Sequence, residues 1–429
     1  MKIITAVLVM AAGALSAQER VREFEPFNRF MERTRFASSM DLRSPRSKVR
    51  GAAAFNEMHR HLLKTYGVVE VKHSFVREGS HFDCVPVNQQ PAVRELALES
   101  IAEAPPQALQ PNAGAAEMSA RAVEELPVDE FGNAMGCEAS TIPMRRIGLE
   151  EMTRFGSLHE FLSKKPEVPA AADGTEIAPA VNAQAHKYAY MQQQVDNLGG
   201  NASLNIWTPY VDTARGEIFS LSQEWYVGGS GAATQTVEVG WQNYPGKYGS
   251  QSPVLFIYWT ADNYSATGCY NLECGAFVQV SNAATIGASL GVSSVAAGAQ
   301  YDVSARFYLY AGNWWLAING NWIGYYPGTL FRGGQMTRFA QSIKFGTESV
   351  GTTTWPGEGS GYWSTAGWSD AAYQRNVFYA DTTGTLQWAN LTAVNPSPAC
   401  YTASGPYWST TSGWGVYFFA GGPGGAGCQ

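Results

Sequence analysis

The sequence contains no histidine after His186 and no tryptophan before Trp207. Without histidine, the C-terminal half alone cannot build a Ser-His-Asp triad, a Cys-His pair or a histidine-rich zinc site. The acid–base groups left there are tyrosines, a few lysines and arginines, and twelve carboxylates. Two halves that differ this much in composition are not expected to share one core. We therefore predict two domains that meet near residue 180.

Charge is scarce too, because charged residues make up only 15% of the chain and the formal net charge is -7. No basic stripe is present, so we expect no nucleic-acid partner. After the first residues, no apolar run approaches the length of a membrane span. The start, Met1-Lys2 followed by apolar residues 3–15 and Ser16-Ala17, predicts a secretory signal peptide over residues 1–17. A membrane anchor is the weaker alternative, since the run is too short. We expect a secreted or periplasmic protein with no membrane contact after signal removal.

The chain is rich in glycine, with 45 copies, and 13% of its residues are aromatic. From residue 187 onward, short segments alternate apolar and polar residues between turn signals, which predicts ten or more strands. We therefore expect a mainly β protein whose residues 186–429 form an antiparallel two-sheet β-sandwich of the jelly-roll type.

Residues 18–165 have a mixed pattern and predict a small α+β domain. Within it, residues 47–67 fit an amphipathic helix that presents Phe55, Met58, Leu62 and Tyr66 on one face. Residues 166–185 are rich in alanine and proline and predict an exposed linker. An exported chain with a separate first domain and such a linker fits a propeptide, but a permanent two-domain protein fits the composition equally well.

Six cysteines in an exported chain predict disulfides. Six cysteines allow 15 pairings, and the spacing favours three local ones: Cys84–Cys137, Cys269–Cys274 and Cys400–Cys428. The Cys269/Cys274 spacing could also form half of a zinc site, but no histidine accompanies it. We predict no metal and no cofactor.

Two predicted strands carry a carboxylate at an unusual place. Glu238 shares a strand face with Gly240, and Glu348 shares one with Gly346. A missing side chain beside an acid leaves room for a substrate, so we predict that both glutamates face one cleft and are catalytic. The alternative is that each points to solvent from an outer face. Gln223 is the odd polar residue of another strand and either is buried and hydrogen-bonded or polarises a substrate carbonyl.

The chain also resembles the neprosin family in a series of ordered motifs. They are Asp83-Cys84-Val85, Gln90-Pro91-Ala92, residues 141–146, His186-Lys187-Tyr188-Ala189, residues 206–209, residues 219–223, residues 238–242, residues 256–262 and residues 268–271. The resemblance implies a glutamic peptidase that cleaves after proline, made as a zymogen, with a β-sandwich catalytic domain. Its catalytic glutamates fall on Glu238 and Glu348. The second motif differs, since relatives usually have Gly-Gly-Glu-Val where this chain has Gly346-Thr347-Glu348-Ser349.

This resemblance leads to further expectations. Activation would cleave within the linker, residues 166–185, where Pro166, Pro169 and Pro179 make self-cleavage after proline feasible. The partners would be proline-containing peptide or protein substrates and the chain's own propeptide, residues 18–165, acting as inhibitor. We expect a monomer. The residues expected to contact substrate are Gln223, Gly240, Trp241, Tyr258, Trp259 and Gly346.

Two neighbouring carboxyls cannot both ionise comfortably, so the pair would hold one proton and work best in acid. One glutamate would activate water and the other would protonate the leaving nitrogen. Two rival hypotheses are a two-carboxylate glycoside hydrolase and a non-catalytic carbohydrate-binding sandwich with tryptophan platforms.

Overall fold

The computed structural model describes residues 24–39, 47–106, 128, 133–164 and 186–428. The predicted signal peptide and the predicted linker with its cleavage site lie outside these ranges. Below, the described residues up to 164 are called the N-terminal domain, and residues 186–428 are called the sandwich. Within the described ranges, no helix is both long and apolar enough to span a membrane.

The N-terminal domain combines short helices with a small antiparallel sheet in the order β1-β2-β3. Its elements are α1 (Phe27–Phe36), α2 (Gly51–Tyr66), β1 (His73–Arg77), β2 (Ser80–Pro86), α3 (Pro91–Glu95), β3 (Thr141–Arg145), α4 (Leu149–Met152) and α5 (Leu158–Leu162).

Helix α2 confirms the amphipathic helix predicted from residues 47–67. The four residues of the predicted face are all buried, and each such side chain contributes roughly 1.5–3 kcal/mol to the free energy of unfolding. The helix ends where Gly67 N donates to the Leu63 carbonyl at 2.9 Å. Its last residue, Tyr66, donates a hydroxyl hydrogen bond of 2.9 Å to the Arg145 carbonyl, which fastens the helix to β3.

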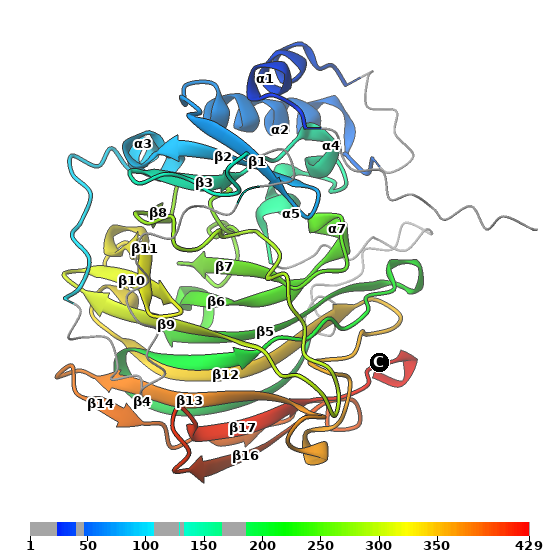
Figure 1. Ribbon diagram of the computed structural model, residues 1–429, viewed down its shortest axis with the longest axis vertical. Coiled ribbons are helices and arrows are strands. Elements are labelled where there is room, and N and C mark those ends of the chain that lie inside the picture. Colours follow the sequence, from blue (N-terminus) through cyan, green and yellow to red (C-terminus); the bar gives the residue numbers. More distant parts are fainter. Residues whose placement is uncertain (1–23, 40–46, 107–127, 129–132, 165–185, 429) are drawn as a thin grey trace, which may run out of the picture.

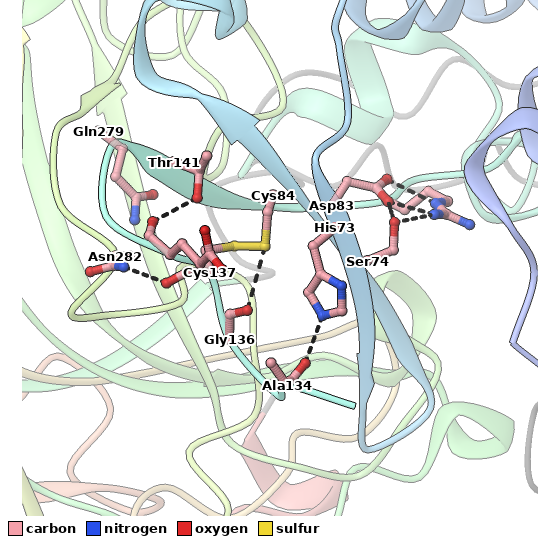
Figure 2. The surroundings of a disulfide bond; sticks show 12 residues. His73, Ser74, Asp83, Cys84, Ala134, Gly136, Cys137, Thr141, Gln279 and Asn282 are labelled. Carbon is pink, nitrogen blue, oxygen red and sulfur yellow. Dashed lines mark hydrogen bonds and ion pairs between the residues drawn. A yellow bond between two sulfur atoms is a disulfide. The ribbon is translucent and has the colours of Figure 1, made fainter. Parts of the chain in front are cut away.

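The three predicted disulfides, Cys84–Cys137, Cys269–Cys274 and Cys400–Cys428, are all present. Figure 2 shows the first of them, which joins β2, the middle strand of the small sheet, to the segment before β3. Asn282 of the sandwich donates a side-chain hydrogen bond to the Cys137 carbonyl. This bridge therefore also holds a contact between the two domains.

The sandwich is built almost entirely from antiparallel strands. They are β4 (His186–Asn205), β5 (Glu217–Gly228), β6 (Gln235–Asn243), β7 (Val254–Thr260), β8 (Val278–Gln279), β9 (Asp302–Tyr310), β10 (Asn313–Ile318), β11 (Asn321–Pro327), β12 (Ala340–Gly351), β13 (Ala372–Asp381), β14 (Leu386–Trp388), β15 (Thr392–Val394), β16 (Thr402–Ser409) and β17 (Gly415–Gly421), with one short helix, α7 (Pro245–Tyr248).

Hydrogen bonding connects the strands in the order β7-β6-β5-β12-β4-β9-β10-β11-β8. The long strand β4 makes the turn between two layers, because its first half pairs with β12 and its second half pairs with β9. Tyr226 of β5 lies against Phe307 of β9 and Trp314 of β10, with ring centroids 6.1 and 6.2 Å apart. Large antiparallel sheets preceded by a small α+β domain confirm the predicted fold class.

The N-terminal domain lies over the end of the sandwich formed by β7 and β8 (Figure 1). Its Gln90 side chain accepts from the Gln279 N–H and donates to the Gln279 carbonyl, both at 2.8 Å, so it satisfies the free edge of β8. Elsewhere in the contact, the buried Lys247 ammonium donates to the Phe161 carbonyl at 2.9 Å and to Glu273 at 2.7 Å. The contact between the domains combines these buried polar bonds with apolar packing, since Phe155 meets Tyr244 of the sandwich with ring centroids 6.1 Å apart. One hydrophobic core spans both domains, so the expectation that the two halves do not share a core is wrong.

Candidate active site

Strands β6 and β12 flank β5, and this arrangement brings the two predicted glutamates onto one face of the sheet. Glu238 pairs with Trp225 of β5, and Glu348 pairs with Leu221. Directly paired residues share a face of an antiparallel sheet, and residues two apart on a strand do so as well. Gln223 lies between Leu221 and Trp225 on β5 and therefore between the two acids. Sequence reasoning predicted the pair but did not identify β5 as the strand between its members.

One lysine ammonium contacts both glutamates. Lys164 Nζ lies 2.6 Å from Glu238 Oε2, 2.9 Å from Glu348 Oε2 and 2.7 Å from Gln223 Oε1. Since both carboxylates touch the same nitrogen, their Oε2 atoms are at most about 5.5 Å apart. All four residues are at least 96% buried. The two acids and the amide therefore form a single buried cluster, with the lysine at its centre.

Lys164 belongs to the N-terminal domain, not to the sandwich. It is the last described residue before the predicted linker and follows helix α5 by two positions. Its main-chain N–H donates to the Tyr258 hydroxyl of β7 at 3.2 Å. Sequence analysis missed this lysine because nothing in its local pattern separates it from a solvent-exposed lysine at a domain end.

The charges in this cluster stabilise one another. Burial alone would raise the pKa of Glu348, but the Lys164 ammonium and the His186 hydrogen bond outweigh burial and lower that pKa to about 2. Burial alone would lower the pKa of Lys164, but the two carboxylates hold it above its usual value. At neutral pH the cluster is therefore an ion pair network of one ammonium between two glutamates.

His186 is the second residue of the site that sequence analysis missed. It is the first residue of β4, and its Nδ1 lies 2.6 Å from Glu348 Oε1. Its ring is stacked on Tyr188, with 6.2 Å between ring centroids, and meets the edge of Phe219 at 6.3 Å. A signal for this residue exists, because His186 begins the motif His186-Lys187-Tyr188-Ala189, but the absence of histidine concerns only the residues after it.

Glu238 has neutral partners on its other oxygen. The Thr236 hydroxyl donates to Glu238 Oε1 at 2.9 Å, and the Tyr264 hydroxyl donates to the same atom at 2.5 Å. Thr236 shares the strand of Glu238, and Tyr264 comes from the loop after β7. The two glutamates therefore differ in kind, since one contacts an imidazole and the other contacts two hydroxyls.

The predicted substrate-contacting residues divide into two groups. Gln223 and Tyr258 lie within the cluster, as described above. Trp241 and Trp259 do not reach it, because each points to the opposite face of its strand. The Trp241 indole donates to the Asn205 carbonyl at 2.9 Å, and Trp259 packs against Tyr326 of the opposite layer.

Gly240 and Gly346 lie beside the acids, but they serve strand packing and do not leave open space. A Cβ on Gly240 would come within 2.0 Å of the Ser222 carbonyl oxygen, and one on Gly346 within 2.5 Å of Tyr190 Cα. The expectation of free room above both glycines is therefore wrong, because a neighbouring strand occupies it.

The residues that depart from the usual second motif face away from the cluster. The Thr347 hydroxyl donates to Glu358 Oε2 at 2.5 Å, and Glu358 is fully buried. Burial raises the pKa of Glu358 well above its usual range, so it is a neutral acid there. Thr347, one of the residues that differ from the usual motif, thus serves as a hydrogen-bond donor to a buried carboxyl behind the sheet.

Replacing Thr347 with the isosteric valine should leave Glu358 without this donor. We expect the free energy of unfolding to fall by about 1–3 kcal/mol, because a buried polar group loses its partner. Thermal unfolding of the purified chain measures this, with the exposed Thr392→Val as the control. An unchanged melting temperature for Thr347→Val would contradict the assignment.

Within the described residues, no group of three or more histidine, cysteine, aspartate or glutamate side chains is arranged to hold a metal ion. The chemistry that the cluster can perform is proton transfer between two carboxyls, with an amide beside them that can both donate and accept a hydrogen bond.

Comparison with known proteins finds a family match within the sandwich. Residues 216–423 match the family model described as Neprosin. Among solved structures, the chain has a likeness to scytalido-glutamic peptidase with a transition state analog inhibitor, at 9% identity and a TM-score of 0.31, covering 55% of this chain and 97% of that one. It also has one to CG-16, a homodimeric agglutinin from chicken liver, at 10% identity and a TM-score of 0.21, covering 38% and 91%. Both structural likenesses are weak.

Proposed function

This chain carries a neprosin domain, and from that premise we propose that it is a glutamic endopeptidase made as an inactive precursor. The observation that carries the proposal is the buried pair of Glu238 and Glu348, brought together by separate strands and bridged by a single ammonium. Two carboxyls this close provide both a general base and a general acid, so the reaction needs neither a histidine-activated nucleophile nor a cofactor.

In the mature enzyme a water molecule takes the place of the Lys164 ammonium. The ionised glutamate removes a proton from this water, and the water oxygen attacks the scissile carbonyl carbon. The protonated glutamate donates a hydrogen bond to the developing oxyanion and then gives its proton to the leaving nitrogen as the C–N bond breaks. The Gln223 amide, which now donates to Glu348 Oε2 at 3.2 Å, is placed to support the oxyanion or orient the water.

The proposed substrates are peptides and proteins cut on the C-terminal side of proline. A pair of aromatic rings supports this preference, because Tyr190 of β4 and Trp225 of β5 lie 5.4 Å apart on the same sheet face as the glutamates. A pyrrolidine ring is compact and apolar and packs well on aromatic faces. The preference itself comes from the family resemblance.

The inactive precursor is supported by the place of Lys164. While the N-terminal domain is attached, this side chain occupies the position that a catalytic water needs and is ion-paired with both acids. The low pKa of Glu348 means that its contribution to the contact is full above about pH 4.5 and is lost as the pH falls toward about 2. Acid would therefore release the lysine, and cleavage within residues 166–185 would make the release permanent.

One experiment tests activation and activity together. Purified full-length protein held at pH 3.5 should acquire a new N-terminus within residues 165–185 and then cleave a peptide containing Ala-Pro-Phe after proline. Protein held at pH 7 should do neither. N-terminal sequencing and mass spectrometry of the products are the measurements.

A matched peptide with Ala-Ala-Phe tests the proline preference, and a polysaccharide panel tests the rival hydrolase and binding hypotheses. If sequencing found no new N-terminus within residues 165–185, the result would count against processing in the linker. Hydrolysis of a polysaccharide with no peptide cleavage would overturn the proposed activity.

A further inference from the structure

His186 is in direct contact with one member of the glutamate pair and not with the other. Its Nδ1 lies 2.6 Å from Glu348 Oε1, and its side chain is 12% exposed. The five other histidines of the chain lie between residues 59 and 159, in the N-terminal domain, so processing in the linker would leave His186 as the one histidine of the sandwich.

The contact is held by the sheet and does not depend on the N-terminal domain. Backbone pairing of β4 with β12 aligns His186 with Val350 and Tyr188 with Glu348, so the imidazole reaches the carboxylate diagonally across two strands. Stacking on Tyr188 and the edge contact with Phe219 fix the orientation of the ring. When Lys164 leaves, this contact therefore stays.

The withdrawal of Lys164 makes the two acids unequal. Glu348 then keeps the contact with the His186 ring nitrogen, whereas Glu238 keeps the hydroxyls of Thr236 and Tyr264. A charge-assisted hydrogen bond favours the ionised form of its acceptor more than a bond from a neutral donor does. The titratable and charged groups that face the imidazole and its glutamate are Tyr188 from β4, Glu238 from β6 and Lys164 from the N-terminal domain, whereas Glu358 from the loop after β12 lies behind the sheet.

We propose that His186 is a positioning residue that holds Glu348 as the ionised general base and so leaves the shared proton on Glu238. The proposal rests on the proposed peptidase function. In the reaction, Glu348 accepts the proton from water and Glu238 gives its proton to the leaving nitrogen. His186 transfers no proton itself, and it acts only through the charge and orientation of Glu348.

The test compares mature enzymes carrying His186→Ala and His186→Asn with a control, Lys187→Ala. Lys187 is the next residue on β4, points to the other face and lies over the Trp355 ring at 5.2 Å. We measure kcat and KM between pH 2.5 and 6.5. For His186→Ala we expect kcat to fall at least 10-fold with KM changed less than threefold. The acid limb of the profile should move to higher pH, because the pKa of Glu348 rises without the imidazole.

Asparagine can donate a neutral hydrogen bond in place of Nδ1, so His186→Asn should recover part of kcat while its acid limb stays displaced. Lys187→Ala should match the wild type. A His186→Ala enzyme whose acid limb coincides with that of the wild type would overturn the proposal, even if its melting temperature fell.

A second readout needs no substrate. In thermal unfolding of the full-length chain, His186→Ala should lower the melting temperature less in a Glu348→Gln background than in the wild type, because the charged partner is already gone. Equal effects in both backgrounds would overturn the pairing. If the wild type cleaves no peptide, the proposed function fails, and this unfolding cycle still decides whether His186 and Glu348 are coupled.

Discussion

Replacing Glu238 or Glu348 with glutamine should lower kcat of the mature enzyme by about 10²- to 10⁴-fold, the range expected for loss of a general acid or base. Glutamine has nearly the shape of glutamate and keeps hydrogen-bonding atoms, but it can neither take a proton from water nor give one to a leaving nitrogen. The double variant should be no slower than the worse single variant, because the two acids act as one unit. Initial rates on the proline-containing peptide measure the effect.

These variants cannot process themselves, so their mature forms require cleavage by a trace of tagged wild-type enzyme that is then removed. Glu217→Gln is the matched control, because Glu217 begins β5 away from the cluster and accepts a main-chain hydrogen bond of 2.8 Å from Asp212. Circular dichroism and thermal unfolding check that the sandwich stays folded. A variant that retained full activity at either position would remove that glutamate from the mechanism.

The sequence was informative where a local pattern carries the structure. Alternation within strands placed Glu238 on the face opposite Trp241, and the structure has this arrangement. The helix over residues 51–66 and the three disulfides likewise follow from spacing alone, since each involves residues near one another or the few cysteines available.

The alternation of side chains along each strand could not show which glutamates meet. Five of the six glutamates of the sandwich are buried, so burial alone does not distinguish the pair. Glu238 and Glu348 meet because β5 pairs with β6 on one side and with β12 on the other. The pairing of β5 with β12 joins segments more than 100 residues apart, and no short pattern encodes it.

Lys164 was beyond prediction for the same reason. Its bond to Glu238 spans 74 residues and crosses from one domain to the other. Trp241 and Trp259 are the reverse case, because the structure places both side chains on the side opposite the cluster. They adjoin residues of the cluster in sequence, but adjacent residues of a strand face opposite sides.

The second large effect should come from Lys164. A full-length chain carrying Lys164→Met should process itself at higher pH than the wild type and at least 10-fold faster at pH 5. Methionine keeps most of the length and apolar stem of lysine but removes the charge that opposes two buried carboxylates. Removing one partner of a buried ion pair typically costs 3–5 kcal/mol, so the contact between N-terminal domain and cluster should weaken strongly.

The direction of the pH effect follows from Glu348. In the wild type its pKa is lowered to about 2, so the contact persists until the pH falls well below 4.5. Without the ammonium the two acids repel each other and this pKa rises, so one of them takes up a proton already in weak acid. The N-terminal domain is then released at a higher pH than in the wild type.

Gel analysis of processing between pH 3 and 7 measures this shift. Lys64→Met is the control, because Lys64 forms an exposed ion pair with Glu95 on the surface of the same domain, far from the glutamates in the sheet. Lys164→Arg keeps the charge on a larger group and should stay inactive at neutral pH if charge is what matters. Lys164→Met could instead remain as inactive as the wild type across this range. Burial of the site by the whole N-terminal domain would then account for inhibition, and the charge of Lys164 would play no part in it.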